Sequence, residues 1–112
     1  MLVYRIERNG HGPYTNHSWT DCYKLQNAHQ ESSKHPGICA DVDGFNRVCH
    51  VCGFRSYKQL TKWFSGWMKR LRKGGFRVHV YEIPKSRVLI GKYQVAFDTL
   101  DTISVDAWPI VT

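Results

Sequence analysis

A pair of cysteines has the spacing that most directly suggests chemistry. Cys49 and Cys52 are separated by two residues and followed by Gly53, as in a zinc knuckle, and His35 with Cys39 can complete a tetrahedral metal site. Residues three positions apart on a strand point to opposite faces, so the two cysteines share a metal only where the chain turns. Reduced cysteine is also a common small core residue. The sequence therefore leaves two alternatives, a structural zinc at these four residues or a metal-free protein.

Sequence patterns of the common catalytic sites are absent. The chain has no Gly-rich phosphate loop, no nucleophile elbow and no His-Glu-x-x-His or deaminase pattern, which makes a catalytic zinc the weakest interpretation. Asp41 and Asp43 lie beside Gly44 and are typical of a turn. Imidazole titrates near neutral pH, so one histidine of the first third of the chain can serve as a general base or ligand. The candidates are His11, His17, His29 and His35.

Residues 56–73 have the pattern of one long amphipathic helix. Ser56 can be the N-cap, Gln59 completes a capping box, and Gly74 can take the left-handed position after the last turn. Apolar side chains recur at spacings of three and four, so they are expected to face the core. They are Tyr57, Leu60, Phe64, Trp67, Met68 and Leu71.

The opposite face of this predicted helix is basic. Lys58, Lys62, Lys69 and Lys73 lie within about 60° of one another on a helical projection. Solvated charge is the simplest interpretation, and contact with an anionic partner, either nucleic acid or an acidic protein, is the functional one. The chain lacks helix-turn-helix, finger and RNP patterns, so sequence-specific DNA recognition is not expected.

The rest of the chain predicts a sheet and a long polar loop region. Residues 8–47 are rich in Gly, Pro, Asn, His and Ser and contain one short helical pattern at about 19–29. Long segments of this kind are commonly functional, so a site is expected there. Strands are predicted at Leu2–Glu7, Val48–Phe54, Phe76–Ile83 and Arg87–Phe97, the last interrupted at Gly91.

The composition fits one globular domain. The 112 residues are 42% hydrophobic and 13% aromatic, so we expect a single α+β domain over residues 1–112, with a small twisted mixed or antiparallel sheet carrying the long helix. No run approaches membrane-spanning length, and the start of the chain lacks the regions of an export signal. We therefore expect no membrane association and a cytoplasmic location. The net charge of +7 favours anionic partners.

Short segments spread over nearly the whole chain resemble a family of small phage and prophage proteins. They are Tyr4–Glu7, Gly12–Tyr14, His35–Pro36, Cys52–Ser56, Gln59–Leu60, Trp63–Phe64, Tyr81–Glu82 and Gln94–Phe97. Small phage accessory proteins often disable or modify a host macromolecule. The resemblance therefore implies a role in the host cytoplasm, with a host protein or ribonucleoprotein, such as a CRISPR defence complex, as the partner.

The order of the elements is also similar to a minimal ADP-ribosyltransferase core, which has an Arg on its first strand, a Ser between a strand and a helix, and an acid on its final strand. Such enzymes bind NAD. The resemblance implies catalytic roles for Arg5, Ser56 and Gln94, and cofactor binding by Arg5, Tyr14 and Ser56. Gln94 departs from the pattern, because an amide cannot act as the catalytic carboxylate.

Two functional interpretations follow. In the first, a cleft near Arg5, Tyr14 and Ser56 binds NAD and transfers or only recognises ADP-ribose. Transfer would need another acid, such as Asp98 or Glu82, and without one the resemblance is structural only. In the second, the protein is a non-catalytic basic binding protein that blocks an acidic protein or nucleic-acid surface through its lysine face. Whether the protein is an enzyme stays open at this point.

Overall fold

The computed structural model describes residues 1–111, and at residue 101 the backbone only. The strands are β1 (Leu2–Glu7), β2 (His50–Gly53), β3 (Arg77–Glu82), β4 (Val88–Ile90), β5 (Val95–Asp98) and β6 (Ile103–Pro109). They form two three-stranded sheets with the orders β1-β3-β6 and β2-β5-β4, and every strand pair in them is antiparallel. The predicted α+β class is confirmed, although the strands form two sheets where one was predicted.

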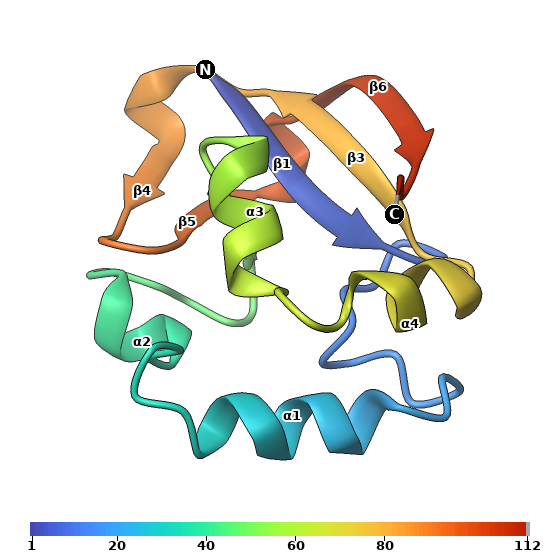
Figure 1. Cartoon of the computed structure of the whole chain (residues 1–112). Helices are drawn as coiled ribbons and strands as arrows, with labels where there is room; N and C mark the ends of the chain where they lie inside the picture. Colours follow the sequence, from blue (N-terminus) through green and yellow to red (C-terminus); the bar gives the residue numbers. More distant parts are fainter. Residues whose placement is uncertain (112) are drawn as a thin grey trace.

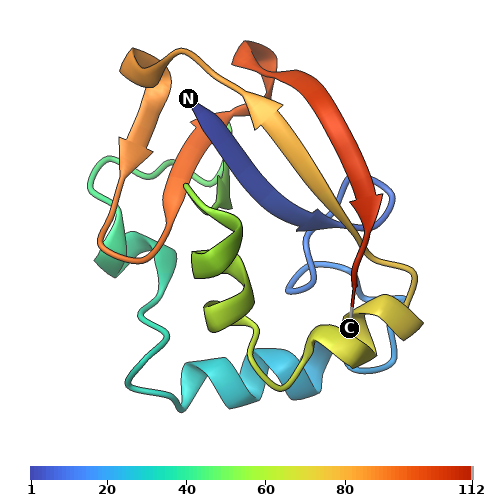
Figure 2. The ribbon, with the colours of Figure 1, turned by 45° about the horizontal axis from the view of Figure 1, so that its top comes forward.

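Short helices cover the sheets from one side (Figures 1 and 2). They are α1 (Cys22–Gln30), α2 (Ile38–Asp41), α3 (Tyr57–Trp63) and α4 (Met68–Lys73), with 3-10 turns at Lys85–Arg87 and Thr99–Asp101. In both views α3 lies close to β1, while α1 runs along the end of the molecule away from the strands. The predicted loop region over residues 8–47 thus contains the expected short helix, α1, and one helix that was not predicted, α2.

The two sheets are joined where β1 passes the end of β2. Tyr4 and Phe54 exchange backbone hydrogen bonds of 2.7 and 2.8 Å. The close approach requires Gly53, because a Cβ at that position would lie 2.7 Å from Val3 Cγ1 and 2.9 Å from the Tyr4 carbonyl oxygen. This junction brings side chains of β1 next to β2, which positions the site described below.

Two apolar clusters stabilise this arrangement. The larger one packs the first sheet against α1, α3 and α4, and it includes Ile6, Leu25, Leu60, Phe64, Leu71 and Phe76. The smaller one lies between the sheets and includes Val3, Ile83, Val95 and Phe97. Burying each large aliphatic or aromatic side chain contributes roughly 1.5–3 kcal/mol.

The single long helix predicted over residues 56–73 is wrong, because α3 ends at Trp63 and α4 begins at Met68. Between them Gly66 has a φ of 86°, a left-handed conformation that interrupts a right-handed helix. The split changes burial along the predicted apolar face. Leu60, Phe64 and Leu71 are buried, whereas Tyr57, Trp67 and Met68 are half-buried at its edge.

The predicted helix ends are correct in part. Ser56 caps α3, since its hydroxyl accepts a hydrogen bond of 3.1 Å from the Gln59 backbone N–H. The reciprocal half of the capping box does not form, because the Gln59 side-chain oxygen is buried without a partner among the described residues. At the end of α4, Gly74 keeps a negative φ of −74°, and Gly75 takes the left-handed position one residue later with a φ of 87°.

The C-terminal part also differs from the prediction. Residues 87–97 form not one interrupted strand but a hairpin of β4 and β5, and β6 was not predicted at all. Asp41 holds the hairpin turn, because its carboxylate accepts the backbone N–H groups of Lys92, Tyr93 and Gln94 at 2.7 to 3.2 Å. Gly91 leaves space for this carboxylate, since a Cβ there would lie 2.8 Å from Asp41 Oδ1.

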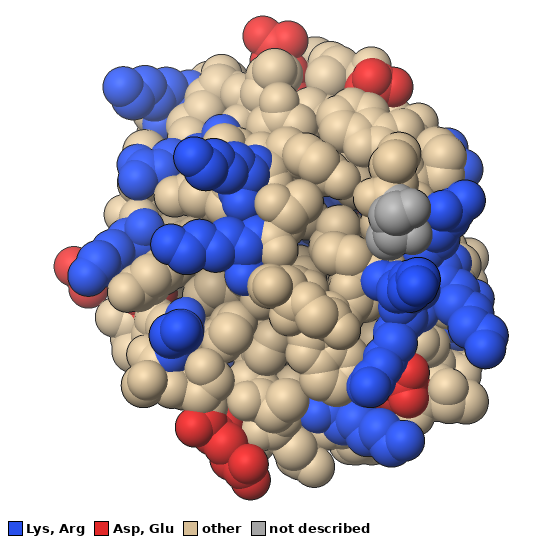
Figure 3. Space-filling view, viewed as in Figure 1, with Lys and Arg blue, Asp and Glu red and all other residues tan. Residues whose placement is uncertain are grey.

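Most of the charged side chains on the face that Figure 3 shows are basic. They gather in two groups at opposite sides of this face, with an uncharged band between them. One group lies over α4 and its surroundings, and the other lies over the side occupied by α3 and β4.

Candidate functional site

A cleft of about 740 Å³ lies between the loop after β1, α1, the segment before α2, strand β2 and the end of α3. Its lining includes two arginines and four histidines and, among the described residues, no Asp or Glu. These basic and imidazole side chains are Arg5, Arg47, His11, His29, His35 and His50. A concave wall with cations and no carboxylate concentrates positive potential and favours an anionic ligand.

Arg5 is the buried cation of this cleft. Its Nη1 donates to the Cys52 carbonyl oxygen at 2.7 Å, and its Nε donates to Glu7 Oε1 at 3.0 Å. A guanidinium has five N–H donors, so these two bonds leave three without a partner among the described residues. Only 11% of the side chain is exposed. The cleft therefore presents a nearly buried positive charge with unused donors.

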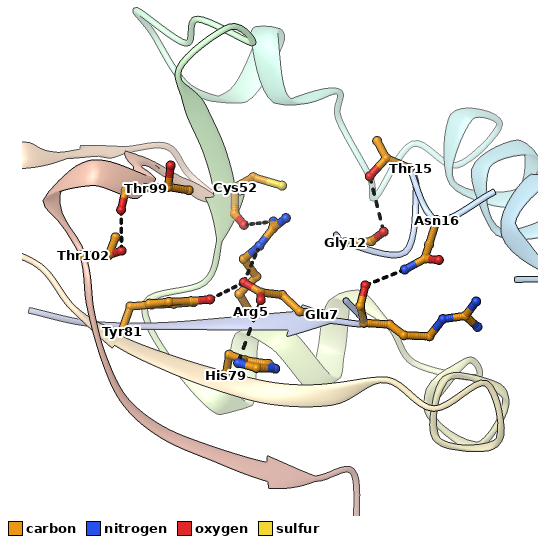
Figure 4. A network of polar contacts seen from close by, with 11 residues as sticks. Arg5, Glu7, Gly12, Thr15, Asn16, Cys52, His79, Tyr81, Thr99 and Thr102 are labelled. Carbon is orange, nitrogen blue, oxygen red and sulfur yellow. Dashed lines mark hydrogen bonds and ion pairs between the residues drawn. The ribbon is translucent and has the colours of Figure 1, made fainter. Parts of the chain in front are cut away.

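Gly12 leaves room for this guanidinium. A Cβ at position 12 would lie 3.3 Å from Nη2 and 3.5 Å from Nη1 of Arg5, tighter than an ordinary contact. Figure 4 shows Arg5 reaching from β1 toward Cys52, with Gly12 in the loop across from its terminal nitrogens. A larger residue at this position would press on the donors that face the cleft.

Glu7 fixes the orientation of Arg5. Its Oε1 accepts from Arg5 and from the Tyr81 hydroxyl, and its Oε2 lies 3.9 Å from His79 Nδ1 (Figure 4). Burial, the hydrogen bond to Glu7 and the charge of Glu7 raise the pKa of Tyr81, so this hydroxyl remains a donor. The carboxylate compensates part of the Arg5 charge and leaves its unused N–H groups directed away from β3.

A second polar group connects α1 and α3 across the cleft. Trp63 Nε1 donates to the Tyr14 hydroxyl at 2.8 Å, and the same hydroxyl is hydrogen-bonded to His29 Nδ1. Burial is the main cause that raises the pKa of Tyr14, and the phenol stays protonated. Three side chains from separate segments are thus held in one orientation.

His29 and His35 stack on each other with ring centroids 3.7 Å apart and an angle of 11° between the rings. His35 Nε2 donates to the Trp63 carbonyl oxygen at 2.6 Å, and its Nδ1 lies 2.8 Å from Ser32 Oγ. Burial, together with the charge of His35, lowers the pKa of His29 from 6.5 to about 4. His29 is therefore neutral at pH 7 and acts as a hydrogen-bonding wall of the cleft.

Gln94 lies in the turn before β5 and also lines the cleft. It is 3% exposed, and its Nε2 donates to the Pro36 carbonyl oxygen at 3.2 Å. The structure thus brings Arg5, Tyr14 and Gln94 to one cleft, as the predicted site required. Ser56 is not part of the lining, and its hydroxyl is engaged as the cap of α3.

The four lysines of the predicted basic stripe are all exposed but belong to two helices. Lys58 and Lys62 lie on α3, and Lys69 and Lys73 lie on α4. They do not form one continuous stripe, because the break at Gly66 separates the two pairs.

The zinc alternative finds no matching geometry. Among residues 1–111 no group of three or more His, Cys, Asp or Glu is arranged to hold a metal ion. Cys39 and Cys49 are exposed, whereas Cys52 and His35 line the cleft, where His35 already bonds to Ser32 and Trp63. The set His35, Cys39, Cys49 and Cys52 is therefore not a metal site in this structure.

Several residues that line the cleft or hold its side chains in place were not identified from the sequence. Glu7 stands two positions after Arg5 on the same strand. Side chains two positions apart on a strand point to the same face, so the sequence could have indicated that Glu7 lies next to Arg5. The roles of Trp63 and Arg47 depend on contacts between distant segments, and no local pattern marks them. His29 belonged to the set of candidate histidines, but its partners Tyr14 and His35 come from outside α1.

The matching family model is described as the Bacteriophage T4 Y00F protein, and it covers residues 1–111. The fold and the basic cleft thus belong to a small α+β phage protein, which confirms the resemblance to phage proteins. The chain belongs to the Bacteriophage T4 Y00F protein family. No curated protein and no solved structure matches the chain. Within the described residues, no helix is both long and apolar enough to cross a membrane.

Proposed function

We propose that this phage protein is an accessory protein that acts on a host macromolecule through its cleft, and that the cleft binds a phosphate-bearing nucleotide of the NAD class. The observation that carries the proposal is the guanidinium of Arg5, nearly buried, with three N–H donors unused by described residues. A pyrophosphate would supply the anionic oxygens that such a group binds by charge-assisted hydrogen bonds.

The other walls of the cleft suit the rest of a nucleotide. Tyr14 and Trp63 provide aromatic surface, and His29 and Gln94 provide polar groups that can select a base or ribose. Arg47 adds a second cation at the same cleft and is itself exposed, so it can move toward a phosphate. A few oriented polar groups on a largely apolar wall are typical of small-molecule sites.

Recognition is favoured over transfer. Gln94 occupies the place of the acid in the transferase pattern, and the described lining contains no carboxylate. Of the other acids considered, Asp98 accepts the Leu100 backbone N–H at 2.9 Å and Glu82 is exposed at the end of β3, and neither lines the cleft. The bound nucleotide would then form part of the surface that contacts a host protein or ribonucleoprotein, such as a CRISPR defence complex.

Calorimetry with NAD, ADP-ribose and adenosine tests the proposal. We expect heat of binding from NAD and ADP-ribose and none from adenosine, because the pyrophosphate makes the decisive contact. Arg47→Glu should weaken binding about tenfold or more, the equivalent of one hydrogen bond to a charged group. Arg55→Glu is the matched control, because Arg55 is also exposed but does not line the cleft.

Two results would overturn the proposal. One is the absence of any heat at millimolar NAD, and the other is an equal loss of affinity in the Arg47 and Arg55 variants. Arg5 itself is a poor test residue, because its removal leaves Glu7 buried without its cation.

A further inference from the structure

Positive charge is concentrated in the middle of the chain. Between Asp43 and Glu82 there is no acidic residue, and this stretch holds nine of the 16 Lys and Arg residues. They are Arg47, Arg55, Lys58, Lys62, Lys69, Arg70, Arg72, Lys73 and Arg77. Clustered like charges repel one another, and they attract anionic partners.

The fold collects five of these cations at one corner. Lys69, Arg70, Arg72 and Lys73 lie on α4 and Arg77 begins β3, and all five are exposed. A six-residue helix is only about 9 Å long, so its four cations lie close together. Figure 3 shows the corresponding group of basic side chains over α4. We call these five residues the α4 corner.

An aromatic side chain lies next to the α4 corner. The Arg70 guanidinium stacks over the Trp67 ring, with its central carbon 4.6 Å from the ring centroid. Trp67 is half-buried, so part of the indole remains accessible. Beside it, Arg70 and Lys73 line a hollow of about 430 Å³ together with Trp19 and Asp21. Asp21 is an acid at this hollow, and it also lies 3.9 Å from Lys24 Nζ.

We propose that the α4 corner binds single-stranded nucleic acid, with its cations on the phosphates and Trp67 and Arg70 as a stacking platform for a base. Proteins that bind single strands without sequence preference combine a basic track with exposed aromatic or guanidinium planes. An acidic protein surface would use the cations but not the stacked pair. The α4 corner lies outside the cleft lining, so this inference is independent of nucleotide binding there.

Fluorescence anisotropy with a labelled oligothymidylate of about 20 nucleotides tests the inference over about 50 to 200 mM salt, the range in which counterion release is steep. We expect the double substitution Lys69→Glu and Lys73→Glu to weaken binding at least about tenfold. It should also reduce the slope of log affinity against log salt by about 1.4, since each phosphate on a single strand contributes about 0.7.

Lys58→Glu with Lys62→Glu is the matched control. It changes the net charge by the same amount on the exposed face of α3, away from the α4 corner. We expect less than about a threefold loss of affinity for this pair, because screening limits the effect of distant charges. Trp67→Leu should weaken binding with little change of the salt slope, because stacking releases no counterions.

Three outcomes would overturn the inference. The first is no binding at the lowest salt, and the second is an equal effect of the two lysine pairs, which would indicate unlocalised attraction. The third is displacement of the labelled strand by polyglutamate as efficiently as by unlabelled oligothymidylate, which would assign the surface to acidic proteins. None of these results depends on whether NAD binds the cleft.

Discussion

Arg5 and the cations of the α4 corner carry the same charge in opposite surroundings. Arg5 is nearly buried, bonded to Glu7 and to a backbone carbonyl, and opposite a loop whose Gly12 leaves it space. The cations of the α4 corner are exposed to solvent. A buried cation acts at low effective dielectric on one ligand group, whereas an exposed cluster attracts any polyanion and is screened by salt.

This difference in burial predicts different binding roles for the cleft and for the α4 corner. The cleft can select a ligand by the geometry of its donors, because Glu7, Tyr81 and Cys52 fix the guanidinium. The α4 corner can supply affinity and rapid association but little selectivity. The comparison therefore predicts that substitutions at the cleft change stability strongly and that those at the α4 corner do not.

Arg5→Ala should have the largest effect. Removing the cation leaves the Glu7 carboxylate buried with Tyr81 and His79 as its remaining partners among the described residues, which we expect to cost about 3–5 kcal/mol of unfolding free energy. Urea denaturation monitored by tryptophan fluorescence measures this loss. The double substitution Arg5→Met with Glu7→Gln should recover much of it, because no unpaired charge remains. A stable single variant would mean that water reaches Glu7.

The tryptophans provide the second contrast. Trp63 is 7% exposed, so Trp63→Ala should cost about 3–5 kcal/mol as a large-to-small core change. Trp67 is half-buried at the break between α3 and α4, and its replacement by alanine should cost clearly less, about 1–2 kcal/mol. Equal losses in chemical denaturation would show that residues 56–73 form the continuous helix after all.

What the sequence could predict here was mostly local. The strand at residues 2–7, the cap at Ser56 and the burial of Leu60, Phe64 and Leu71 were predicted correctly because neighbouring residues determine them. The break at Gly66 was missed, since the apolar spacing continues across it and Gly alone is tolerated within helices. Strand β6 was also missed, although Ile103 and Val105 alternate with Ser104 and Asp106 as in a strand, and its first five residues are exposed.

The site was less predictable than the fold. Arg5, Tyr14 and Gln94 were named from a resemblance and do meet at the cleft, but no periodicity in the sequence required it. Asp41 was interpreted as part of a local turn, and it instead holds a hairpin more than 50 positions away. Contacts between segments this far apart depend on the tertiary arrangement, which a single sequence does not encode locally.

The third prediction concerns pH and the cleft wall. Because the pKa of His29 is lowered from 6.5 to about 4 in the fold, the neutral imidazole is the favoured form there. Its contribution to stability is complete above about pH 6.5 and is lost progressively as the pH falls to about 4. His29→Asn keeps a hydrogen-bonding partner for the Tyr14 hydroxyl and should flatten the stability profile over this range. Thermal unfolding at several pH values is the measurement, with the exposed His17 as the control position for the same substitution.

The smallest effect is expected at the α4 corner. Lys69 lies in the first turn of α4 and Lys73 ends it, so they interact with opposite ends of the helix dipole. Lys69→Glu should stabilise by a few tenths of a kcal/mol and Lys73→Glu should destabilise by a similar amount, roughly 0.3–1 kcal/mol each at low salt. The free energy of unfolding of the double variant should therefore differ from that of the original protein by less than about 0.5 kcal/mol. A loss of nucleic-acid binding by this variant would then not be caused by unfolding. A destabilisation by both single variants would mean that these lysines hold specific partners and that the α4 corner, like Arg5, is a structural cation site.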